Sequence, residues 1–138
     1  MDKVTLDAYL FFDGNCGEAM KFYEGVFGGK LAIQTYDEVP GDVPGKEKMK
    51  GKVIHASLTG GDVNLMGSDT RDKALGAGKI ELSLSGDDDA KLRKVFNGLS
   101  AGGKVRTPLE KQFWGDTFGS LTDKFGIDWM VNINAKKA

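Results

Sequence analysis

Residues 22–31 read FYEGVFGGKL, and residues 95–105 read VFNGLSAGGKV. Both stretches contain an apolar pair, a glycine two residues later, and then Gly-Gly-Lys followed by an aliphatic residue. Glycine after an apolar helical stripe favours the end of a helix, because it adopts the left-handed conformation of a C-cap at little cost. The two Gly-Gly-Lys units begin at Gly28 and Gly102, about half of the 138-residue chain apart, and this separation predicts an internal duplication.

The segments around these two stretches repeat in the same order. In the first half, the residue patterns predict a helix over 15–27 and strands at 3–12, 30–36, 52–59 and 63–67. In the second half, they predict a helix that starts near Asp88 and stops at Gly102, with strands at 79–85, 104–107, 112–121 and 127–133. We therefore expect an α+β fold of two βαβββ modules, 1–70 and 77–138, which form a single domain over 1–138 with a joining loop near 68–78.

Two features of the first module leave alternatives open. Asn15 and Glu18 have the spacing of a capping box, which places Cys16 at a helix N-terminus, where the helix dipole would stabilise a thiolate. Cys16 is therefore either a reactive thiol or a small residue of the first helical turn. Residues 37–51 have no counterpart in the second module, and this loop either covers a site or forms an extended hairpin tip.

Composition and charge exclude several classes of function. The chain has 19 Lys and Arg against 20 Asp and Glu, a net charge of −1 without a basic patch, so nucleic acid is not an expected partner. No apolar run approaches the roughly 18 residues of a membrane span, so no membrane partner is expected either. The single cysteine, Cys16, and the lack of an apolar leader segment near Met1 predict a cytoplasmic protein.

Three stretches carry a resemblance to a known family: YLFFDGNCGEAMKFYEGVFGGKL at 9–31, KVIHASL at 52–58 and FWGDTFGSLTDKFGIDWMVN at 113–132. Together they resemble the PhnB-like branch of the vicinal oxygen chelate superfamily, which also contains glyoxalase, bleomycin-resistance and dioxygenase proteins. The resemblance implies the glyoxalase/bleomycin-resistance fold, in which two βαβββ modules curl their mixed sheets into open barrels. It also implies a homodimer.

The resemblance further implies where a metal ion would bind. Superfamily enzymes usually hold a divalent metal with His, Gln or Glu side chains on their strands, and the matching positions here are Ala8, Lys79 and Met130. Alkyl, ammonium and thioether groups do not hold Zn²⁺, Mn²⁺ or Fe²⁺ in a nitrogen–oxygen site. A register error of one residue would place Asp7 or Tyr9 at the first position. We therefore predict no metal site and no cofactor, with a divalent metal as the alternative.

Two residues are candidates for acid–base chemistry. His55 is the only histidine of the chain. It is either a general base or ligand-orienting group in the barrel, or a structural imidazole at a sheet face or dimer seam. Glu81 is the second candidate, because a register shift of two residues would bring it to a ligand position. Beyond His55 and Glu81, the sequence identifies no catalytic residue.

Aromatic residues cluster in the first strand and in the last quarter of the chain. A curled sheet packs one face on its helix and lines the cavity with the other, so strand alternation divides these rings between core and pocket. A small-molecule site is usually an aromatic-lined cavity with a few polar groups, whereas the alternative here is core and dimer packing. The predicted ligand-binding residues are Tyr9, Phe11, His55, Trp114, Asp116, Phe118 and Trp129.

Two hypotheses for function follow. The first is a protein that binds a small molecule in an aromatic-lined barrel cavity without the usual catalytic metal. The second is an enzyme, either a metal-dependent glyoxalase-like lyase or isomerase or a dioxygenase, or one that uses His55 or Glu81 as an acid or base. The lack of usual metal ligands favours the first. The glycine pairs end helices rather than begin them, which argues against the cofactor loop of a methyltransferase.

Overall fold

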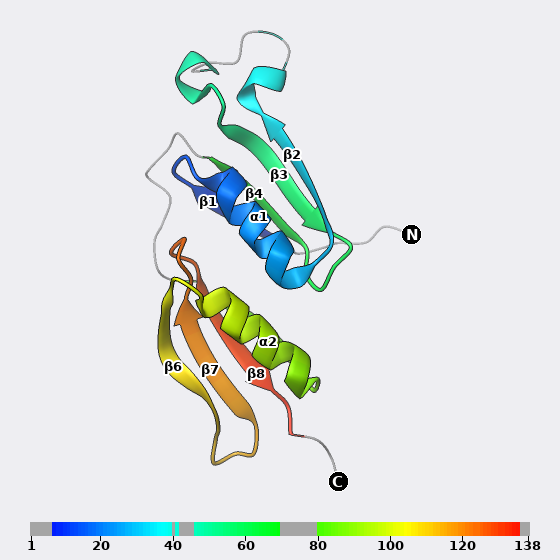
Figure 1. Cartoon of the computed structure of the whole chain (residues 1–138), viewed down its shortest axis with the longest axis vertical. Coiled ribbons are helices and arrows are strands. Elements are labelled where there is room, and N and C mark those ends of the chain that lie inside the picture. The colour runs from blue at the N-terminus through cyan, green and yellow to red at the C-terminus, as the bar shows by residue number, and fades with distance from the viewer. Residues whose placement is uncertain (1–6, 40, 42–45, 70–79, 136–138) are drawn as a thin grey trace. The chain divides into compact units, whose positions relative to one another are not determined.

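The computed structural model describes residues 7–39, 41, 46–69 and 80–135. The chain divides into two compact units, Met1–Ala74 (unit 1) and Leu75–Ala138 (unit 2) (Figure 1). The first residues of the predicted strand at 3–12, most of the predicted joining loop and the predicted ligand position Lys79 lie outside the described residues.

The described residues of each unit form one α-helix and one four-stranded sheet. Unit 1 consists of β1 (Ala8–Phe12), α1 (Cys16–Phe27), β2 (Lys30–Thr35), 3-10 helices at Tyr36–Glu38 and Lys46–Met49, β3 (Val53–Thr59) and β4 (Leu65–Asp69). Unit 2 consists of β5 (Leu82–Gly86), α2 (Asp89–Ser100), β6 (Lys104–Lys111), β7 (Thr117–Thr122) and β8 (Asp128–Ile133).

The two sheets have the same topology. The strand order is β1-β4-β3-β2 in unit 1 and β5-β8-β7-β6 in unit 2 (Figure 1). In each sheet the first strand pairs with the last in parallel, and the other pairs are antiparallel. The predicted α+β fold of two βαβββ modules is therefore confirmed, and the shared strand order supports the predicted duplication.

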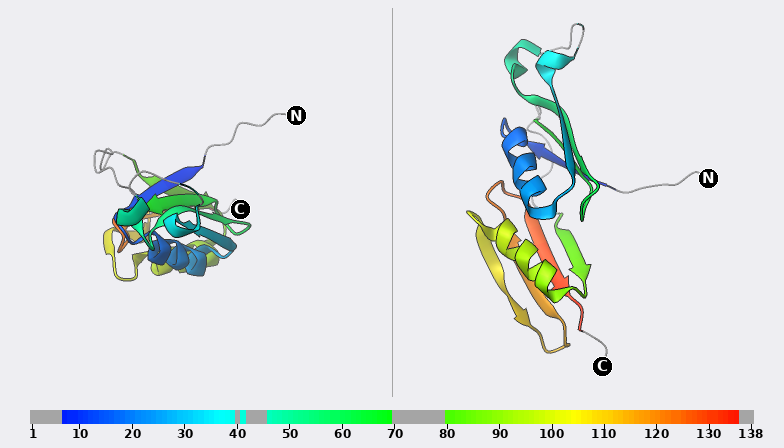
Figure 2. Two further views of the ribbon diagram at one scale, coloured as in Figure 1. Left: turned by 90° about the horizontal axis from the view of Figure 1, so that it is seen from above. Right: turned by 45° about the vertical axis from the view of Figure 1, so that its right-hand side comes forward.

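Close packing of α1 identifies the covered face of the sheet in unit 1. A Cβ atom added at Gly67 of β4 would lie 3.3 Å from the sulfur atoms of Cys16 and Met20, so Gly67 faces α1. Its register partners Leu10 and Ala56 face the helix too, and both are buried. Figure 2 shows α1 lying over this one face of the sheet. Within the described residues of unit 1, no helix covers the opposite face.

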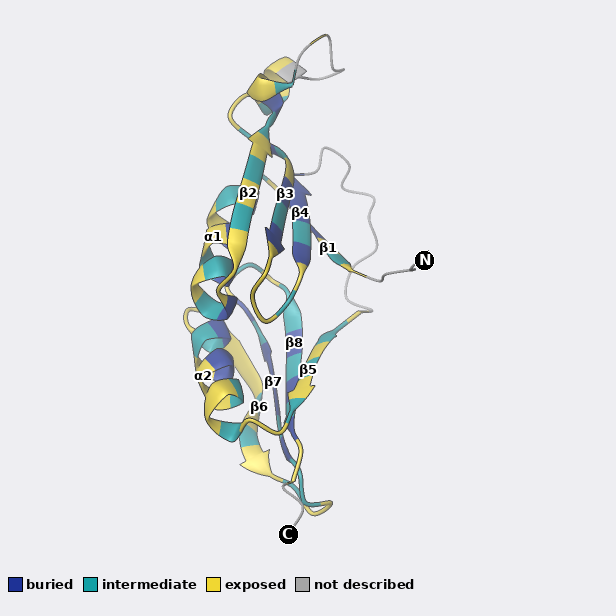
Figure 3. Cartoon of the chain, turned by 90° about the vertical axis from the view of Figure 1, so that its right-hand side faces the viewer, coloured by how far each residue is buried: buried dark blue, intermediate teal, exposed yellow. Residues whose placement is uncertain are grey.

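The sheet of unit 2 is covered in the same way. A Cβ atom added at Gly119 of β7 would lie 2.9 Å from the ring of Phe96 on α2, so Gly119 faces that helix. Leu121 and its partner Trp129 lie two residues along on the same face and are buried. Complete burial of a large apolar side chain contributes about 1.5–3 kcal/mol. The edge strand β6, by contrast, is exposed along most of its length (Figure 3).

A buried carboxylate joins three segments of unit 1. Asp69, at the end of β4, is 2% exposed, and its Oδ1 accepts hydrogen bonds from the backbone N–H groups of Gly14 and Cys16, both at 2.9 Å. Its Oδ2 accepts from the N–H of Val53 at the start of β3, also at 2.9 Å. Asp69 thereby satisfies a donor at the N-terminus of α1. The predicted capping box is wrong, because the side chain of Asn15 makes no capping hydrogen bond.

The second glycine of each Gly-Gly-Lys unit is required by close packing. A Cβ atom at Gly29, whose φ is +100°, would lie 2.6 Å from the carbonyl oxygen of Thr59. A Cβ atom at Gly103 would overlap the carbonyl oxygen of Thr122. Thr59 and Thr122 end β3 and β7, and each pairs with the lysine of its unit's motif. The repeated motif therefore marks the same backbone contact in both units.

Several strand boundaries differ from the prediction. β6 continues to Lys111, four residues beyond the predicted end at residue 107. β4 continues to Asp69, two residues beyond the predicted end at residue 67. β7 begins only at Thr117, because a turn precedes it. In that turn, the N–H of Gln112 donates to the carbonyl oxygen of Asp116 at 2.7 Å.

The loop at 37–51 is tied together at its two ends. The carboxylate Oδ2 of Asp37 accepts a hydrogen bond from the N–H of Gly51 at 2.9 Å. The two 3-10 helices, Tyr36–Glu38 and Lys46–Met49, supply short stretches of regular structure that the sequence did not predict.

Both α-helices are short. α1 and α2 have 12 residues each, which corresponds to about 18 Å of helix. Within the described part of the chain, no helix is long and apolar enough to cross a membrane.

Asp69→Asn is expected to destabilise the protein, because an amide group would replace a carboxylate oxygen that accepts from a buried N–H group. A buried donor left without its acceptor costs about 1–3 kcal/mol, so we expect the free energy of unfolding to fall by about 2–3 kcal/mol. Urea denaturation measures the change. Asp87→Asn, at an exposed residue, is the matched control and should stay within about 0.5 kcal/mol of the wild type. Equal losses in the two variants would contradict the role of Asp69.

Gly29→Ala and Gly103→Ala are each expected to lower the free energy of unfolding by about 1–3 kcal/mol, because the added Cβ atom collides with backbone. Gly25→Ala is the control, since a Cβ atom at this position of α1 meets nothing within 4 Å. It should stabilise the protein by up to about 1 kcal/mol through higher helix propensity. Thermal unfolding of the three variants measures the effect. A Gly29→Ala variant as stable as Gly25→Ala would show that the contact is not needed.

Candidate functional site

The uncovered face of the sheet in unit 1 carries an aromatic cluster, which consists of Tyr9, Phe11 and His55. Tyr9 and Phe11 alternate on β1 with the buried Leu10 and Phe12, so they point away from α1. The two side chains are 37% and 47% exposed, and their ring centroids lie 5.1 Å apart. His55 of β3 lies on the same face, with its ring centroid 5.7 Å from that of Tyr9.

A hydrogen bond links two members of this cluster. The hydroxyl oxygen of Tyr9 lies 3.0 Å from Nδ1 of His55. The contact passes over β4, which separates β1 from β3 in the sheet. The structure thus brings together three residues of the predicted ligand-binding set, and their binding role stays a prediction. The sequence could not predict the hydrogen bond, because its partners are 46 positions apart.

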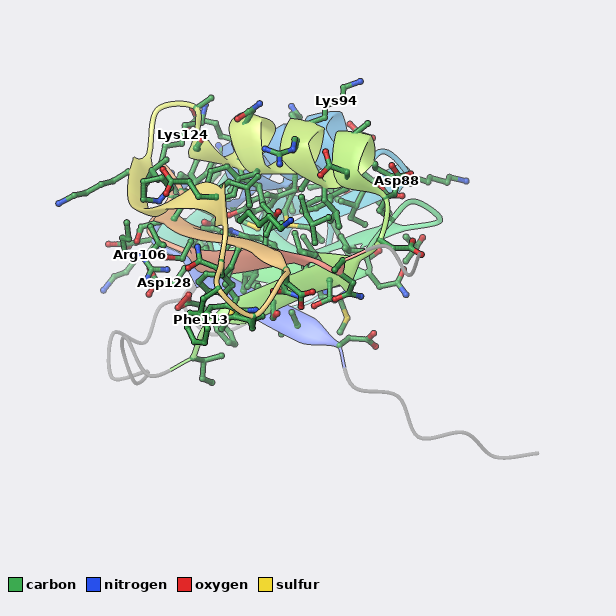
Figure 4. All side chains as sticks on the ribbon, turned by 90° about the horizontal axis from the view of Figure 1, so that it is seen from below. Asp88, Lys94, Arg106, Phe113, Lys124 and Asp128 are labelled. Carbon is green, nitrogen blue, oxygen red and sulfur yellow. The ribbon has the colours of Figure 1, made fainter. Side chains whose placement is uncertain are left out.

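The uncovered face of unit 2 carries a charged group that the sequence analysis missed. Arg106 of β6 donates from one guanidinium nitrogen to Glu81 at 2.9 Å and to the carbonyl oxygens of Leu121 and Trp129 at 3.1 and 3.4 Å. Figure 4 shows Arg106 and Asp128 next to each other on the side of the sheet away from α2. The pairing of β6 with β7 shifts register around Arg106, so a simple alternating pattern could not place this side chain.

The ion pair between Arg106 and Glu81 bears on the predicted role of Glu81. The hydrogen bond that Arg106 donates to Glu81 is the main cause that raises the pKa of Arg106, while burial opposes it. The side chains are 38% and 26% exposed, so solvent screens the pair, and such pairs contribute at most about 1 kcal/mol. The Glu81 carboxylate is therefore engaged with a guanidinium, which does not favour it as a general base.

Both carboxylate oxygens of Asp116 accept hydrogen bonds from residues at the end of the chain's last strand. Its Oδ1 accepts a hydrogen bond from the N–H of Ala135 at 2.8 Å, and its Oδ2 accepts from the side-chain amide of Asn132 at 3.1 Å. These hydrogen bonds, that of Ala135 first, lower the pKa of Asp116. Both oxygens hold the end of β8, which favours a structural role over the predicted ligand contact.

The remaining predicted aromatic residues lie in three different surroundings. Trp129 is 1% exposed, faces α2 and donates from Nε1 to Asp123 at 2.9 Å. It is therefore a core residue on the helix side of the sheet, which does not favour the predicted ligand contact. Phe118 lies on the opposite, uncovered face, because the next residue of β7 faces α2. Trp114 is half exposed in the β6–β7 turn, where it packs edge to face on Phe113.

The donor atoms of the two uncovered faces do not fit the divalent metal of the superfamily enzymes. Ala8 lies on the helix side of β1, and Tyr9 takes the uncovered position instead. Met130 lies on the uncovered face of β8, between the buried Trp129 and Val131, but its thioether is not a ligand of an N/O metal site. Within the described residues, no three His, Cys, Asp or Glu side chains are placed to hold a metal ion together.

The strand registers relate the two uncovered faces position by position. Thr59 and Thr122 are equivalent, because each ends its strand and pairs with the lysine of the repeated motif. Counting back from them along β3 and β7, and then across the paired strands, gives the other equivalent positions. The polar and aromatic residues of unit 1 are replaced in unit 2, whereas a methionine occurs at the centre of both faces. The equivalent pairs are Tyr9 with Ser83, Phe11 with Ser85, His55 with Phe118 and Met66 with Met130.

Cys16 lies in the first turn of α1 and is completely buried. Burial first, and then the nearby charge of Asp69, raise the pKa of the Cys16 thiol to about 12. Desolvation disfavours the thiolate and here outweighs any stabilisation by the helix dipole. The structure therefore favours the small-residue alternative over a reactive thiol.

A family model now identifies the relatives of this fold. The model of the Glyoxalase/Bleomycin resistance protein/Dioxygenase superfamily matches residues 5–131. The chain belongs to this superfamily. Its two modules of identical topology are therefore those of the glyoxalase/bleomycin-resistance fold, as the resemblance implied.

Several individual proteins of the superfamily are similar to this chain over nearly its whole length. Protein YjdN of Escherichia coli (strain K12) is 29% identical, over 94% of this chain and 95% of its own length. The protein PA1353 from Pseudomonas aeruginosa is 36% identical, with a TM-score of 0.82 over 97% of this chain and 100% of that chain. A PhnB protein from Bacillus cereus, described as a putative 3-demethylubiquinone-9 3-methyltransferase, is 27% identical, with a TM-score of 0.73 over 95% and 100%. The PhnB-like resemblance is thereby confirmed.

In the folded protein at pH 8, Cys16 is expected to react with an aromatic disulfide reagent at least about 100-fold more slowly than in urea, because only the thiolate is nucleophilic. The raised pKa keeps the thiol protonated, and burial blocks access to it. The absorbance of the released thiol measures both rates. Comparable rates in the folded and unfolded protein would contradict the burial of Cys16.

Proposed function

We propose that this protein binds a small molecule against the uncovered face of the sheet in unit 1, without a catalytic divalent metal, and that it acts as a cytoplasmic homodimer. The observation that carries the proposal is the aromatic cluster of unit 1. Tyr9 and Phe11 leave much of their ring surface exposed beside a histidine. Apolar surface with a few fixed polar groups is the usual composition of a small-molecule site.

The core packing of unit 1 does not explain this cluster. The side of the sheet that faces α1 already contains the buried residues Leu10, Phe12, Ala56 and Leu58. The cluster lies on the other side, and unit 2 forms the same module with serines at the positions of Tyr9 and Phe11. The rings are therefore not a requirement of the fold, which supports a role in contact with a ligand.

An acid–base enzyme that uses His55 is the second candidate function. The imidazole lies exposed on the uncovered face, with a hydroxyl group hydrogen-bonded to one of its nitrogens. A glyoxalase-like or dioxygenase reaction that depends on a metal is less well supported, because the described donors do not form a ligand set. Binding requires only the surface that is present, and we therefore place it first.

Phe11→Ala is expected to weaken the binding of small aromatic compounds about tenfold, because it removes a large apolar contact from the cluster. The probe is 2-naphthoate, titrated into the isotope-labelled full chain and followed by backbone amide shifts. Phe113→Ala is the matched control, since Phe113 is the most exposed aromatic ring and lies outside the cluster. It should leave the affinity within about twofold of the wild-type value, which corresponds to less than about 0.5 kcal/mol.

Three outcomes would count against the proposal. Equal losses in Phe11→Ala and Phe113→Ala would indicate non-specific adsorption to exposed rings. Absence of any shift in the strands of unit 1 would remove the site itself. Finally, the affinity should be the same with and without a chelator, and one tightly held metal ion per chain in elemental analysis of untagged protein would contradict metal-free binding.

A further inference from the structure

The short contact between the Tyr9 hydroxyl and Nδ1 of His55 bears on which imidazole nitrogen carries the hydrogen. A neutral imidazole has one N–H donor and one acceptor nitrogen. A phenol is a good donor, and an unprotonated imidazole nitrogen is a better acceptor than a phenol oxygen. With 3.0 Å between the hydroxyl oxygen and Nδ1, the favoured arrangement has Tyr9 donating to Nδ1. The hydrogen of the neutral ring then lies on Nε2.

This arrangement leaves a donor available on the uncovered face. Within the described residues, Nε2 of His55 has no hydrogen-bond partner, since its one hydrogen bond in the chain is through Nδ1. The ring lies exposed beside Tyr9, whose own ring packs against that of Phe11. A fixed N–H group thus lies next to two exposed aromatic surfaces.

The same position in unit 2 shows that the fold does not need this pair. His55 corresponds to Phe118 and Tyr9 to Ser83, and neither of these can reproduce the hydrogen bond between an imidazole and a phenol. Unit 2 nevertheless has the same strand order and the same coverage by its helix. The βαβββ module therefore forms without the Tyr9–His55 pair, which occurs only on the uncovered face of unit 1.

We propose that Nε2–H of His55 donates a hydrogen bond to the ligand, that Tyr9 is the positioning residue that holds this tautomer, and that the ligand is a planar, largely apolar molecule carrying an oxygen acceptor. A carboxylate or a carbonyl group next to an aromatic ring has this chemistry. The ring of the ligand lies against Tyr9 and Phe11, and its oxygen meets Nε2. This inference rests on the proposed binding function and specifies the class of molecule that is bound.

The test compares two probes, 2-naphthoate and 2-methylnaphthalene, which share the ring system but differ in the oxygen acceptor. The wild-type chain is expected to bind 2-naphthoate about tenfold more tightly, as one hydrogen bond to a charged group would give. His55→Phe, which installs the residue found at the equivalent place of unit 2, should abolish this difference while 2-methylnaphthalene still binds. Tyr9→Phe keeps the ring, and should reduce only the affinity for 2-naphthoate, by about threefold to tenfold.

A spectroscopic readout separates positioning from simple structural support. Nitrogen-15 shifts of the neutral imidazole should show Nε2 protonated and Nδ1 unprotonated in the wild type. In Tyr9→Phe, the shifts should move toward a mixture of the two tautomers, with backbone amide shifts otherwise preserved.

The outcomes distinguish this inference from the proposed function. If both probes bind the cluster equally well and His55→Phe changes neither, the binding site stands and the role of His55 is overturned. A wild-type imidazole protonated on Nδ1 also overturns it. If neither probe perturbs the strands of unit 1, the proposed function fails, and this inference fails with it.

Discussion

In the part of the chain that the structure describes, one α-helix covers each sheet, and one helix covers only one of the two faces. Strand alternation then divides the residues strictly, because neighbouring side chains point to opposite sides. On the covered side, Gly67 and Gly119 give the helices room to approach closely, and apolar side chains fill the remainder. The sheet side chains that stay accessible therefore come from the other side, and Tyr9 and Arg106 lie there.

The two units stabilise the same architecture with different buried carboxylates. In unit 1, Asp69 joins the start of α1 to the start of β3, which positions the helix on the sheet. Its equivalent position in unit 2 is Ile133, an apolar residue. There, Asp123 instead accepts from the indole of Trp129 and from two backbone N–H groups of the β7–β8 turn. The topology thus tolerates exchange of its polar supports, and the contact at Gly29 and Gly103 is what both units retain.

The parts of the structure that could be predicted from the sequence are those with local causes. Helix ends at glycine pairs, strand alternation and the repeated order all depend on neighbouring residues, and they lead to the correct modules. The candidate site depends on register, in which one residue changes the face, so Ala8 was placed where Tyr9 lies. Clustering of aromatic residues likewise does not tell which face of β8 Trp129 occupies, and the structure places it on the helix side. The contact between Tyr9 and His55 joins strands that are far apart in the sequence, and no local sequence pattern predicts it.

Comparison of equivalent positions shows which residues on the uncovered faces are not required by the shared fold. A duplicated module begins with two identical faces, so differences between them cannot be demands of the shared fold. Methionine occurs at the centre of both faces, at positions 66 and 130, whereas the flanking positions differ in chemistry. Unit 1 has a phenol and an imidazole where unit 2 has Ser83 and Phe118, and unit 2 adds the ion pair of Arg106 with Glu81. The two faces are therefore suited to different chemical groups.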